Sequence, residues 1–335
     1  MTMISYDESN RCLSVEHLTT VFPLEDKKEL VAVEDVSFEL YRGETLGIVG
    51  ESGSGKSMLV KSVLKLLPRP GKTVAGKVIL DGIDISNYKD NQMRKEVRGT
   101  KMSMIFQEPM TALNPSFNIE WQIGEVYKLH TKLSKAERRE KSIEMLRLVR
   151  IPDPEKRIKD YPHQFSGGMR QRAIIAIALA AHPEILIADE PTTALDVTVQ
   201  ADIMDLLDDL KRKEKLSIIL ISHNLNMVTE RSDRIAVFYA GNIMEMATTQ
   251  DIVKNPLHPY TQGLMNSLPD IQNEGQKITA IPGELPDMAN KPSGCPFRPR
   301  CTHATELCAQ VKPELMEIEP GHFCRCHMYS KESGQ

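Results

Sequence analysis

GESGSGKS, residues 50–57, fits the pattern G-x-x-x-x-G-K-[ST] of loops that bind phosphate groups. It follows the apolar run TLGIV (45–49), which predicts a buried strand, and leads into SMLVKSVLKLL (57–67), which has helical spacing. Backbone N–H groups of such a loop point at phosphate, and the helix N-terminus adds partial positive charge. Lys56 is expected to neutralise phosphate oxygens and Ser57 to bind Mg²⁺. We therefore predict a nucleotide site formed by Gly50, Ser52, Gly53, Ser54, Gly55, Lys56 and Ser57.

Composition and charge limit the partners of this chain. Its 335 residues hold 42 Lys and Arg against 46 Asp and Glu, a formal net charge of -4. Proteins that bind the phosphate backbone of nucleic acids usually have a positive net charge or a basic face. We therefore expect no nucleic-acid partner. KAERREK (135–141) interleaves acids with bases and predicts a solvated helix face. The chain shows neither a secretion signal nor a long apolar run, so we expect no membrane span.

The order of predicted strands and helices indicates an α/β fold. Short apolar runs in residues 11–50 predict strands, whereas residues 109–180 have an almost wholly helical pattern in which Ser134 and Glu137 form a capping box. EILIADE (184–190) and SIILISH (217–223) predict buried strands on either side of an amphipathic helix. From Pro256 onward, prolines multiply and aliphatic periodicity fades. We therefore predict a domain at 1–255 with a helical insert at about 109–180, and a C-terminal segment at 256–335.

Two carboxylates lie at the tip of the predicted strand in ILIADEP (185–191). Asp189 is the expected Mg²⁺ partner, and Glu190 is placed to orient or deprotonate a water that attacks the γ-phosphate. Such a pair can also simply cap the following helix, but a phosphate loop in the same chain favours catalysis. Gln107 ends the run MSMIF, and its amide is expected to contact Mg²⁺ and the attacking water. His223 is a candidate γ-phosphate contact, although a lone histidine at a strand end is more often structural.

FSGGMRQR (165–172) places a serine and two glycines before the apolar run AIIAIALAA. The serine hydroxyl and the backbone amides, which glycine leaves open to close approach, lie at a helix start. They can therefore form a second anion site that works in the same way as the phosphate loop. The alternative is a glycine-rich turn into a core helix. Together with GESGSGKS, Gln107, ILIADEP, ALD (194–196) and SH (222–223), this stretch makes residues 11–250 resemble the ATP-binding subunits of ABC transporters.

The resemblance implies a P-loop ATPase core with a RecA-like mixed sheet, an antiparallel β subdomain and an inserted helical subdomain. It also implies that two such chains pair head to tail around two ATP molecules. Each ATP is then held by the phosphate loop of one chain and by Ser166, Gly167 and Gly168 of the other, with Asp196 at the dimer interface. Phe22 fits the aromatic residue that the family stacks on adenine, although a lone phenylalanine is more often part of a core.

Five of the six cysteines lie in the C-terminal segment, whose stretches PLHPYTQGLMNSLP, IPGELPDM, GCPFRPRC and PGHFCRCH resemble the extension of oligopeptide and dipeptide importer ATPases. Some of these hold a [4Fe-4S] cluster, and the matching ligands here are Cys295, Cys301, Cys308 and Cys326. Four thiolates hold either such a cluster or tetrahedral Zn²⁺. The intervals of 5, 6 and 17 residues exceed the usual zinc spacing of about two to four. Iron is therefore expected before zinc, and zinc before no metal.

The same resemblance implies an ATP-hydrolysing subunit of an oligopeptide or dipeptide importer, peripheral at the cytoplasmic face of the inner membrane. The expected partners are a second ATPase subunit (a related chain or an identical one), two transmembrane permeases and an extracytoplasmic peptide-binding protein. The alternatives are an ABC importer ATPase for nickel chelates or other small solutes, and a soluble ABC ATPase without a transport role.

Overall fold

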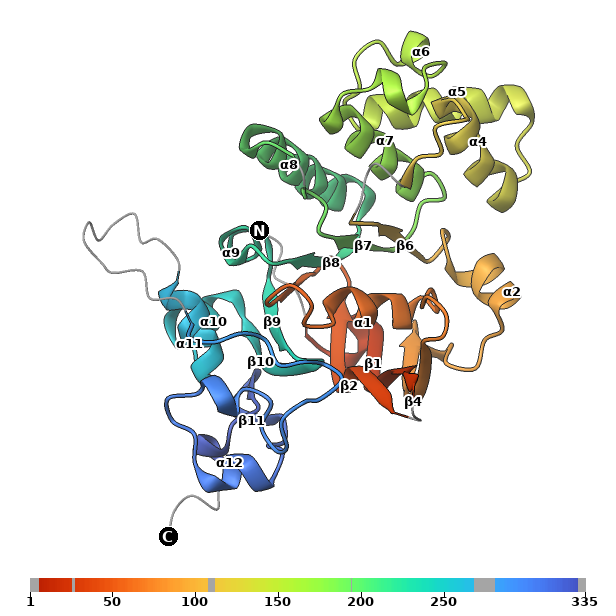
Figure 1. The fold of residues 1–335 in the computed structure, drawn as a ribbon. Helices are drawn as coiled ribbons and strands as arrows, with labels where there is room; N and C mark the ends of the chain where they lie inside the picture. Colours follow the sequence, from red (N-terminus) through yellow and green to blue (C-terminus); the bar gives the residue numbers. More distant parts are fainter. Residues whose placement is uncertain (1–5, 26–27, 108–111, 194, 268–280, 331–335) are drawn as a thin grey trace. The chain divides into compact units, whose positions relative to one another are not determined.

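A computed structural model describes residues 6–25, 28–107, 112–193, 195–267 and 281–330 (Figure 1). The first residues of the predicted helical insert, 109–111, lie outside the described residues, as does residue 194 of the ALD stretch. The chain divides into two units. The first holds residues 1–5, 41–44 and 87–220, and the second holds residues 6–40, 45–86 and 221–335.

The second unit contains strands of two sheets. In one sheet, β1 pairs antiparallel with β4, and β4 with β5. In the other, β3 runs parallel to β9, and β9 antiparallel to β10. The predicted α/β fold with a mixed sheet is confirmed. The first sheet has the order β2 (Glu29–Tyr41), β1 (Arg11–Pro23), β4 (Lys72–Leu80), β5 (Ile83–Asp84), and the second includes, in order, β11 (Met316–Glu319), β12 (His322–Cys324), β10 (Asn242–Thr248), β9 (Arg234–Tyr239) and β3 (Thr45–Val49).

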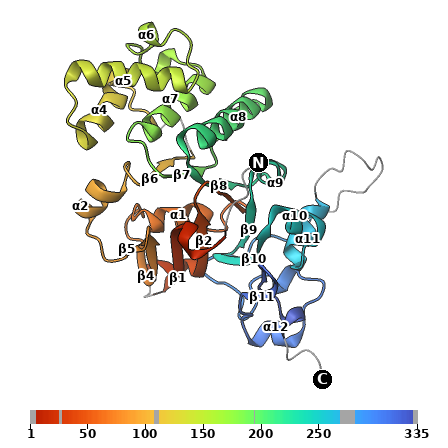
Figure 2. The ribbon, with the colours of Figure 1, turned by 180° about the vertical axis from the view of Figure 1, so that it is seen from behind.

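Helix α1 (Lys56–Val63) begins at the phosphate loop, as predicted, but ends earlier than the run 57–67 suggested. Lys65 adopts φ +52°, and the Leu66 N–H reaches back to the Lys61 carbonyl at 2.7 Å. This left-handed residue and six-to-one hydrogen bond are the termination motif that closes many helices. Seen from behind, α1 lies beside β1 and β4 (Figure 2).

The first unit contains β6, β7 and most of β8, with β6 and β7 parallel. Residues 112–180, predicted to be almost wholly helical, form helices α4 to α7 joined by loops, and the predicted capping box of Ser134 and Glu137 starts α5. The strands are β6 (Met102–Ile105), β7 (Ile185–Asp189) and β8 (Ser217–Ser222). The helices are α2 (Asp90–Gln92), α4 (Ile119–His130), α5 (Lys135–Leu148), α6 (Pro154–Arg157), α7 (Gly167–Leu179) and α8 (Val197–Glu214).

The C-terminal segment shares its core with the preceding strands. Strand β12 pairs with β10, and Tyr260, Cys295 and Phe297 are buried in one cluster with β9 residues such as Tyr239. A segment with few aliphatic residues thus gains buried apolar area from an existing core instead of forming its own. The remaining helices of this unit are α9 (Leu225–Arg231), α10 (Thr249–Lys254), α11 (Pro259–Asn266) and α12 (Glu306–Gln310).

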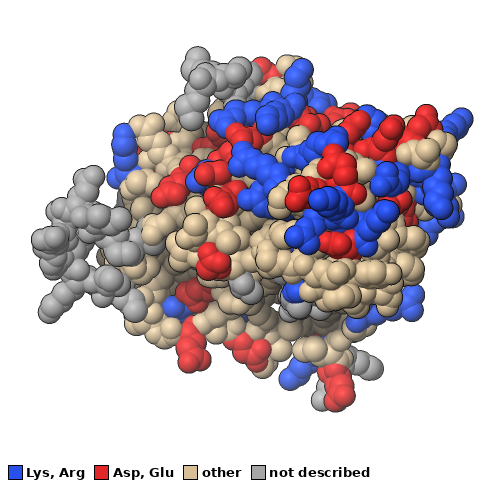
Figure 3. All heavy atoms as spheres, turned by 90° about the horizontal axis from the view of Figure 1, so that it is seen from above, with Lys and Arg blue, Asp and Glu red and all other residues tan. Residues whose placement is uncertain are grey.

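The surface carries charges of both signs. On the face shown in Figure 3, basic and acidic side chains are interleaved. On α5, for example, Lys141 pairs with Glu144 at 2.7 Å, so the predicted solvated helix face is confirmed. Within the residues that the structure describes, every helix lacks the length or the hydrophobicity of a membrane span.

Candidate functional site

The phosphate loop lies between β3, in which all five residues are buried, and α1. Two of its glycines are required by close approach. A Cβ at Gly50 would lie 2.0 Å from the Phe238 carbonyl oxygen, and one at Gly55 would lie 2.3 Å from that of Ala32. Gly55, at φ +106°, also precedes the first turn of α1, which has no side-chain cap. The loop therefore presents backbone N–H groups at a helix N-terminus, the arrangement that binds anions.

Polar side chains of the loop are held close to its backbone. The buried Lys56 ammonium donates to the Gly50 and Glu51 carbonyls at 2.8 and 2.9 Å. Ser54 is fully buried, and its hydroxyl has no hydrogen-bond partner among the described residues. Ser52 and Gly53 are exposed, and Ser57 is partly buried. The loop thus combines a fixed ammonium with accessible backbone, as a polyphosphate site needs.

Gln107 and Glu190, 83 residues apart in sequence, meet in the first unit. The Gln107 Nε2 donates to Glu190 Oε2 at 2.9 Å, and the Thr193 hydroxyl donates to the same oxygen, also at 2.9 Å. Strands β6 and β7 are parallel, with Ile105 opposite Ala188, so residues just past both strands leave the same sheet edge. Asp189 ends β7 and is only 1% exposed.

Glu190 has a backbone conformation that bulky residues rarely adopt, with φ +47°. Such strain persists where surrounding structure fixes it, and it is common in functional sites. Its carboxylate, held by an amide and a hydroxyl, is suited to accept a proton from water. Sequence reasoning missed Thr193, although its place three residues after Glu190 was a usable signal.

The serine and glycines of FSGGMRQR start helix α7. Ser166 is the N-cap, and its hydroxyl accepts from the Met169 N–H at 3.4 Å. Ser166 and Gly167 are exposed, whereas a Cβ on Gly168 would lie 2.8 Å from Val199 Cγ1. Packing against α8 therefore explains Gly168, but it does not explain Gly167, where a Cβ would be 3.4 Å from Leu195 Cδ2.

Three other predicted residues lie at element ends. Asp196 caps α8, accepting from the Val199 N–H at 2.9 Å. His223 is exposed and follows β8 directly. Phe22, near the end of β1, is partly buried, and its ring would be 2.5 Å from a Cβ on Gly71.

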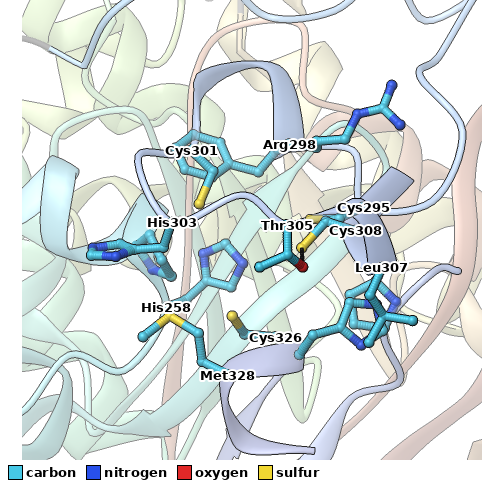
Figure 4. Close-up of a pocket in the computed structure, with 14 residues that line it drawn as sticks. His258, Cys295, Arg298, Cys301, His303, Thr305, Leu307, Cys308, Cys326 and Met328 are labelled. Carbon is cyan, nitrogen blue, oxygen red and sulfur yellow. Dashed lines mark hydrogen bonds between the residues drawn. The ribbon is translucent and has the colours of Figure 1, made fainter. Parts of the chain in front are cut away.

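The four cysteines predicted as cluster ligands line one pocket of about 250 Å³ in the second unit (Figure 4). Cys324 does not line it. In Figure 4 the sulfurs of Cys301, Cys308 and Cys326 face a common space. Within the described ranges, no three His, Cys, Asp or Glu side chains are close enough together to hold one metal ion.

The pocket disfavours free thiolates. Burial raises the pKa of Cys295 to about 11, and it raises the pKa of Cys301 and Cys326 as well. Neighbouring sulfurs contribute in the same direction, because each negative thiolate opposes ionisation of the next. A cation in the pocket reverses this effect, since metals bind thiolates and stabilise them.

The fold and the loop define a P-loop nucleotide-binding protein. Comparison with known proteins is consistent with this class. The family described as ABC transporter matches residues 33–193, and the family described as oligopeptide/dipeptide transporter, C-terminal region, matches residues 244–308. Among solved structures, the dimeric ATP-binding cassette MJ0796 bound to ADP and Pi is 27% identical, with a TM-score of 0.63 over 71% of this chain and 98% of that one.

Curated relatives match nearly the whole chain. A probable peptide ABC transporter ATP-binding protein of Sinorhizobium fredii is 48% identical over 97% of both chains. The oligopeptide transport ATP-binding protein of Escherichia coli K12 is 46% identical over 96% of this chain and 95% of its own. A dipeptide transport ATP-binding protein of Bacillus subtilis is 47% identical over 90% of each. This chain belongs to the ABC transporter family, among the ATP-binding proteins of peptide transporters.

Proposed function

We propose that this chain binds and hydrolyses ATP to drive uptake of oligopeptides or dipeptides. The phosphate loop binds the phosphates through its backbone N–H groups and Lys56. Ser57, Gln107 and Asp189 supply a hydroxyl, an amide and a carboxylate, the oxygen donors that Mg²⁺ prefers. When bound, Mg²⁺ neutralises charge that develops on the phosphates.

Glu190 is assigned as the residue that orients and deprotonates the attacking water. This assignment rests on two hydrogen bonds: Gln107 and Thr193 each donate to Oε2 of Glu190, at 2.9 Å. With its position fixed, the carboxylate directs water toward the γ-phosphorus instead of sampling several rotamers. His223, just after the neighbouring strand β8, is assigned to contact the γ-phosphate.

Glu190→Gln tests the assignment, because it keeps the shape and removes the base. In the assembled transporter we expect a turnover at least ~100-fold lower, with ATP binding retained. The matched control is Glu184→Gln, just before the same strand, where the carboxylate pairs with Arg42 at 2.9 Å. A normal rate in Glu190→Gln would remove the assignment.

We infer that the Ser166–Gly168 segment completes the ATP site of a neighbouring subunit, either a related chain or an identical one. Ser166, Gly167 and Asp196 are exposed, and the adjacent apolar Val197 is 82% exposed. An exposed serine hydroxyl and exposed backbone amides at a helix start can bind a phosphate group of another molecule. The other proposed partners are two permeases in the inner membrane and an extracytoplasmic peptide-binding protein, which leaves this chain peripheral at the cytoplasmic face.

The transport role is supported by the match of residues 244–308 to the peptide-transporter C-terminal family. Mass spectrometry of the intact complex, extracted in mild detergent, is expected to find permease subunits bound to this chain. Peptide uptake by reconstituted vesicles should then depend on ATP. Uptake of nickel chelates but not peptides would favour the first alternative, and a chain that extracts without permeases would favour a soluble ATPase.

We further propose that Cys295, Cys301, Cys308 and Cys326 hold a [4Fe-4S] cluster. They are distributed around a pocket of about 250 Å³, and in a cubane each thiolate binds a different iron. A single Zn²⁺ instead needs four sulfurs around one point. Four thiols that line one pocket support the proposal, and the cluster would crosslink parts of the C-terminal segment that are far apart in sequence.

The cluster has a direct chemical test. Protein purified without oxygen is expected to contain about four iron and four sulfide per chain and to absorb visible light. Cys301→Ser should lower the iron content, whereas Cys324→Ala, outside the pocket, should retain it. Stoichiometric zinc without sulfide, or no metal at all, would contradict the proposal whatever the ATPase activity.

A further inference from the structure

The C-terminal segment contacts the phosphate loop through a charged pair. Nη1 of Arg300 donates to both carboxylate oxygens of Glu51, at 2.9 Å each. Glu51 is the second residue of the loop, 249 residues earlier in the sequence. The side chain of Arg300 is only 6% exposed and that of Glu51 is 28% exposed, so solvent screens this pair less than a surface pair.

Arg300 is itself held from several sides. Its Nε donates to the Pro282 carbonyl at 2.8 Å, and its guanidinium lies 5.7 Å from the ring centre of Tyr239 and 5.9 Å from that of Phe297. Both rings belong to the buried cluster shared with β9. A guanidinium fixed in this way presents its charge to Glu51 at little further cost in side-chain entropy.

A second contact of the same segment reaches the loop backbone. The Glu51 N–H donates to the Tyr260 hydroxyl at 3.1 Å, and Tyr260 is fully buried in α11. Both the main chain and the side chain of Glu51 are therefore bound by residues beyond the sheet that carries the loop. Sequence reasoning gave no role to Glu51, Tyr260 or Arg300.

We propose that Arg300 is a positioning residue for ATP, acting through Glu51. An unpaired carboxylate in a loop that binds polyphosphate repels the ligand, because like charges a few ångströms apart in a partly buried site interact strongly. Arg300 cancels that charge and holds the loop residue in place. This inference rests on the proposed role of the phosphate loop, and it makes the C-terminal segment part of the nucleotide site.

A double-mutant cycle tests the proposal. In the full-length chain, Arg300→Met is expected to raise the Kd for ATP about tenfold. Arg300→Met combined with Glu51→Gln should bring the Kd back to within about threefold of the original value, because the repelling charge is gone. In the assembled transporter, Arg300→Met should raise KM for ATP with kcat nearly unchanged, since neither residue touches reacting atoms.

Arg298→Met is the matched control for loss of one positive charge from the same short helix, because the Arg298 guanidinium donates to Ser293 instead. It is expected to leave the Kd for ATP unchanged. An unchanged Kd in Arg300→Met overturns the proposal, and so does a double variant as weak as the single one, which would indicate a structural loss only.

Two further variants keep the outcome decisive. If Arg300→Met does not fold, Glu51→Gln alone is expected to bind ATP more tightly, since Arg300 then offers uncancelled positive charge to the phosphates. Weaker binding by folded Glu51→Gln would contradict the inference. Lys56→Ala tests the loop itself: normal ATP binding there would overturn the proposed nucleotide site, independently of Arg300.

Discussion

The glycines of this chain are of two kinds: some are required by close packing in the fold, and one is not. Gly50, Gly55 and Gly168 are forced by neighbouring atoms, because a Cβ at each would come within 2.8 Å of another residue. Gly167 is different, since its nearest neighbour would lie at 3.4 Å and its φ is not in the left-handed region. A position that tolerates alanine sterically but holds an exposed glycine points to close approach by something outside the chain.

Gly167→Ala is therefore expected to keep stability and lose activity. The free energy of unfolding, measured with urea, should change by less than about 1 kcal/mol, because alanine is accepted at a helix start. ATPase turnover of the assembled transporter should fall at least ~10-fold, because the added methyl group blocks the approach of the neighbour's ATP. Full activity with normal stability would contradict the proposed role of this glycine.

Elements of the second unit are joined by a charged cluster around Glu34 on β2. Lys291 and Lys312 contact its carboxylate at 3.2 and 2.9 Å. Burial raises the pKa of Glu34, but the hydrogen bonds and charges of Lys312 and Lys291 outweigh burial and lower it to about 2. The C-terminal segment is thus attached to β2 by ion pairs, in addition to the apolar cluster around Phe297.

This pairing predicts a pH dependence of stability. Because the folded pKa is depressed, the stabilisation is complete above the unfolded pKa of 4.5 and is lost as pH falls toward about 2. The difference in unfolding free energy between the original chain and Glu34→Gln should shrink by about 1 kcal/mol between about pH 6 and pH 3, a value reduced for partial exposure. The shrinkage should be smaller in a Lys312→Met background. If the difference in unfolding free energy between the original chain and Glu34→Gln stays constant with pH, the predicted pH dependence is wrong.

At the scale of the whole molecule, the residues that we propose for ATP binding belong to both units. The phosphate loop belongs to the second unit, and Glu190 and the Ser166–Gly168 segment belong to the first. Ser166 and Gly167 are exposed at a helix start, where their groups are available to another molecule. In the pairing that we propose, each subunit supplies the other's ATP site with donors that the other chain does not itself provide.

We expect the isolated chain to hydrolyse ATP about a hundredfold more slowly than the assembled transporter, the cost of losing donors to the γ-phosphate. Its turnover per chain should rise with protein concentration if it pairs with itself, and only on addition of the related subunit if it does not. Turnover of dilute isolated chain equal to that of the complex would contradict a shared site.

Local patterns predicted much of this protein. The phosphate-loop motif between a strand and a helix, the two carboxylates at the tip of the strand ILIAD and the capping box at Ser134 all depend on neighbours in sequence. The geometry of one turn or strand end fixes each of them. The family could be predicted from the same motifs, because each motif is a short stretch and their order can be read directly along the chain. Even so, α1 ends at Val63 through a left-handed Lys65 that helical periodicity does not reveal.

The contacts between residues far apart in sequence were decided by the tertiary structure and could not be read from spacing along the chain. The bonds from Gln107 to Glu190 and from Arg300 to Glu51 join residues 83 and 249 positions apart. The core that β9 shares with the cysteine-rich segment also joins residues that are far apart in sequence. Such contacts arise because buried apolar surface brings distant segments together and buried charges must then find partners. The motifs assigned Gln107 and Glu190 to one site, but no periodicity or motif encodes the hydrogen bond between them or the pair of Arg300 and Glu51, since these contacts exist only once the chain has folded.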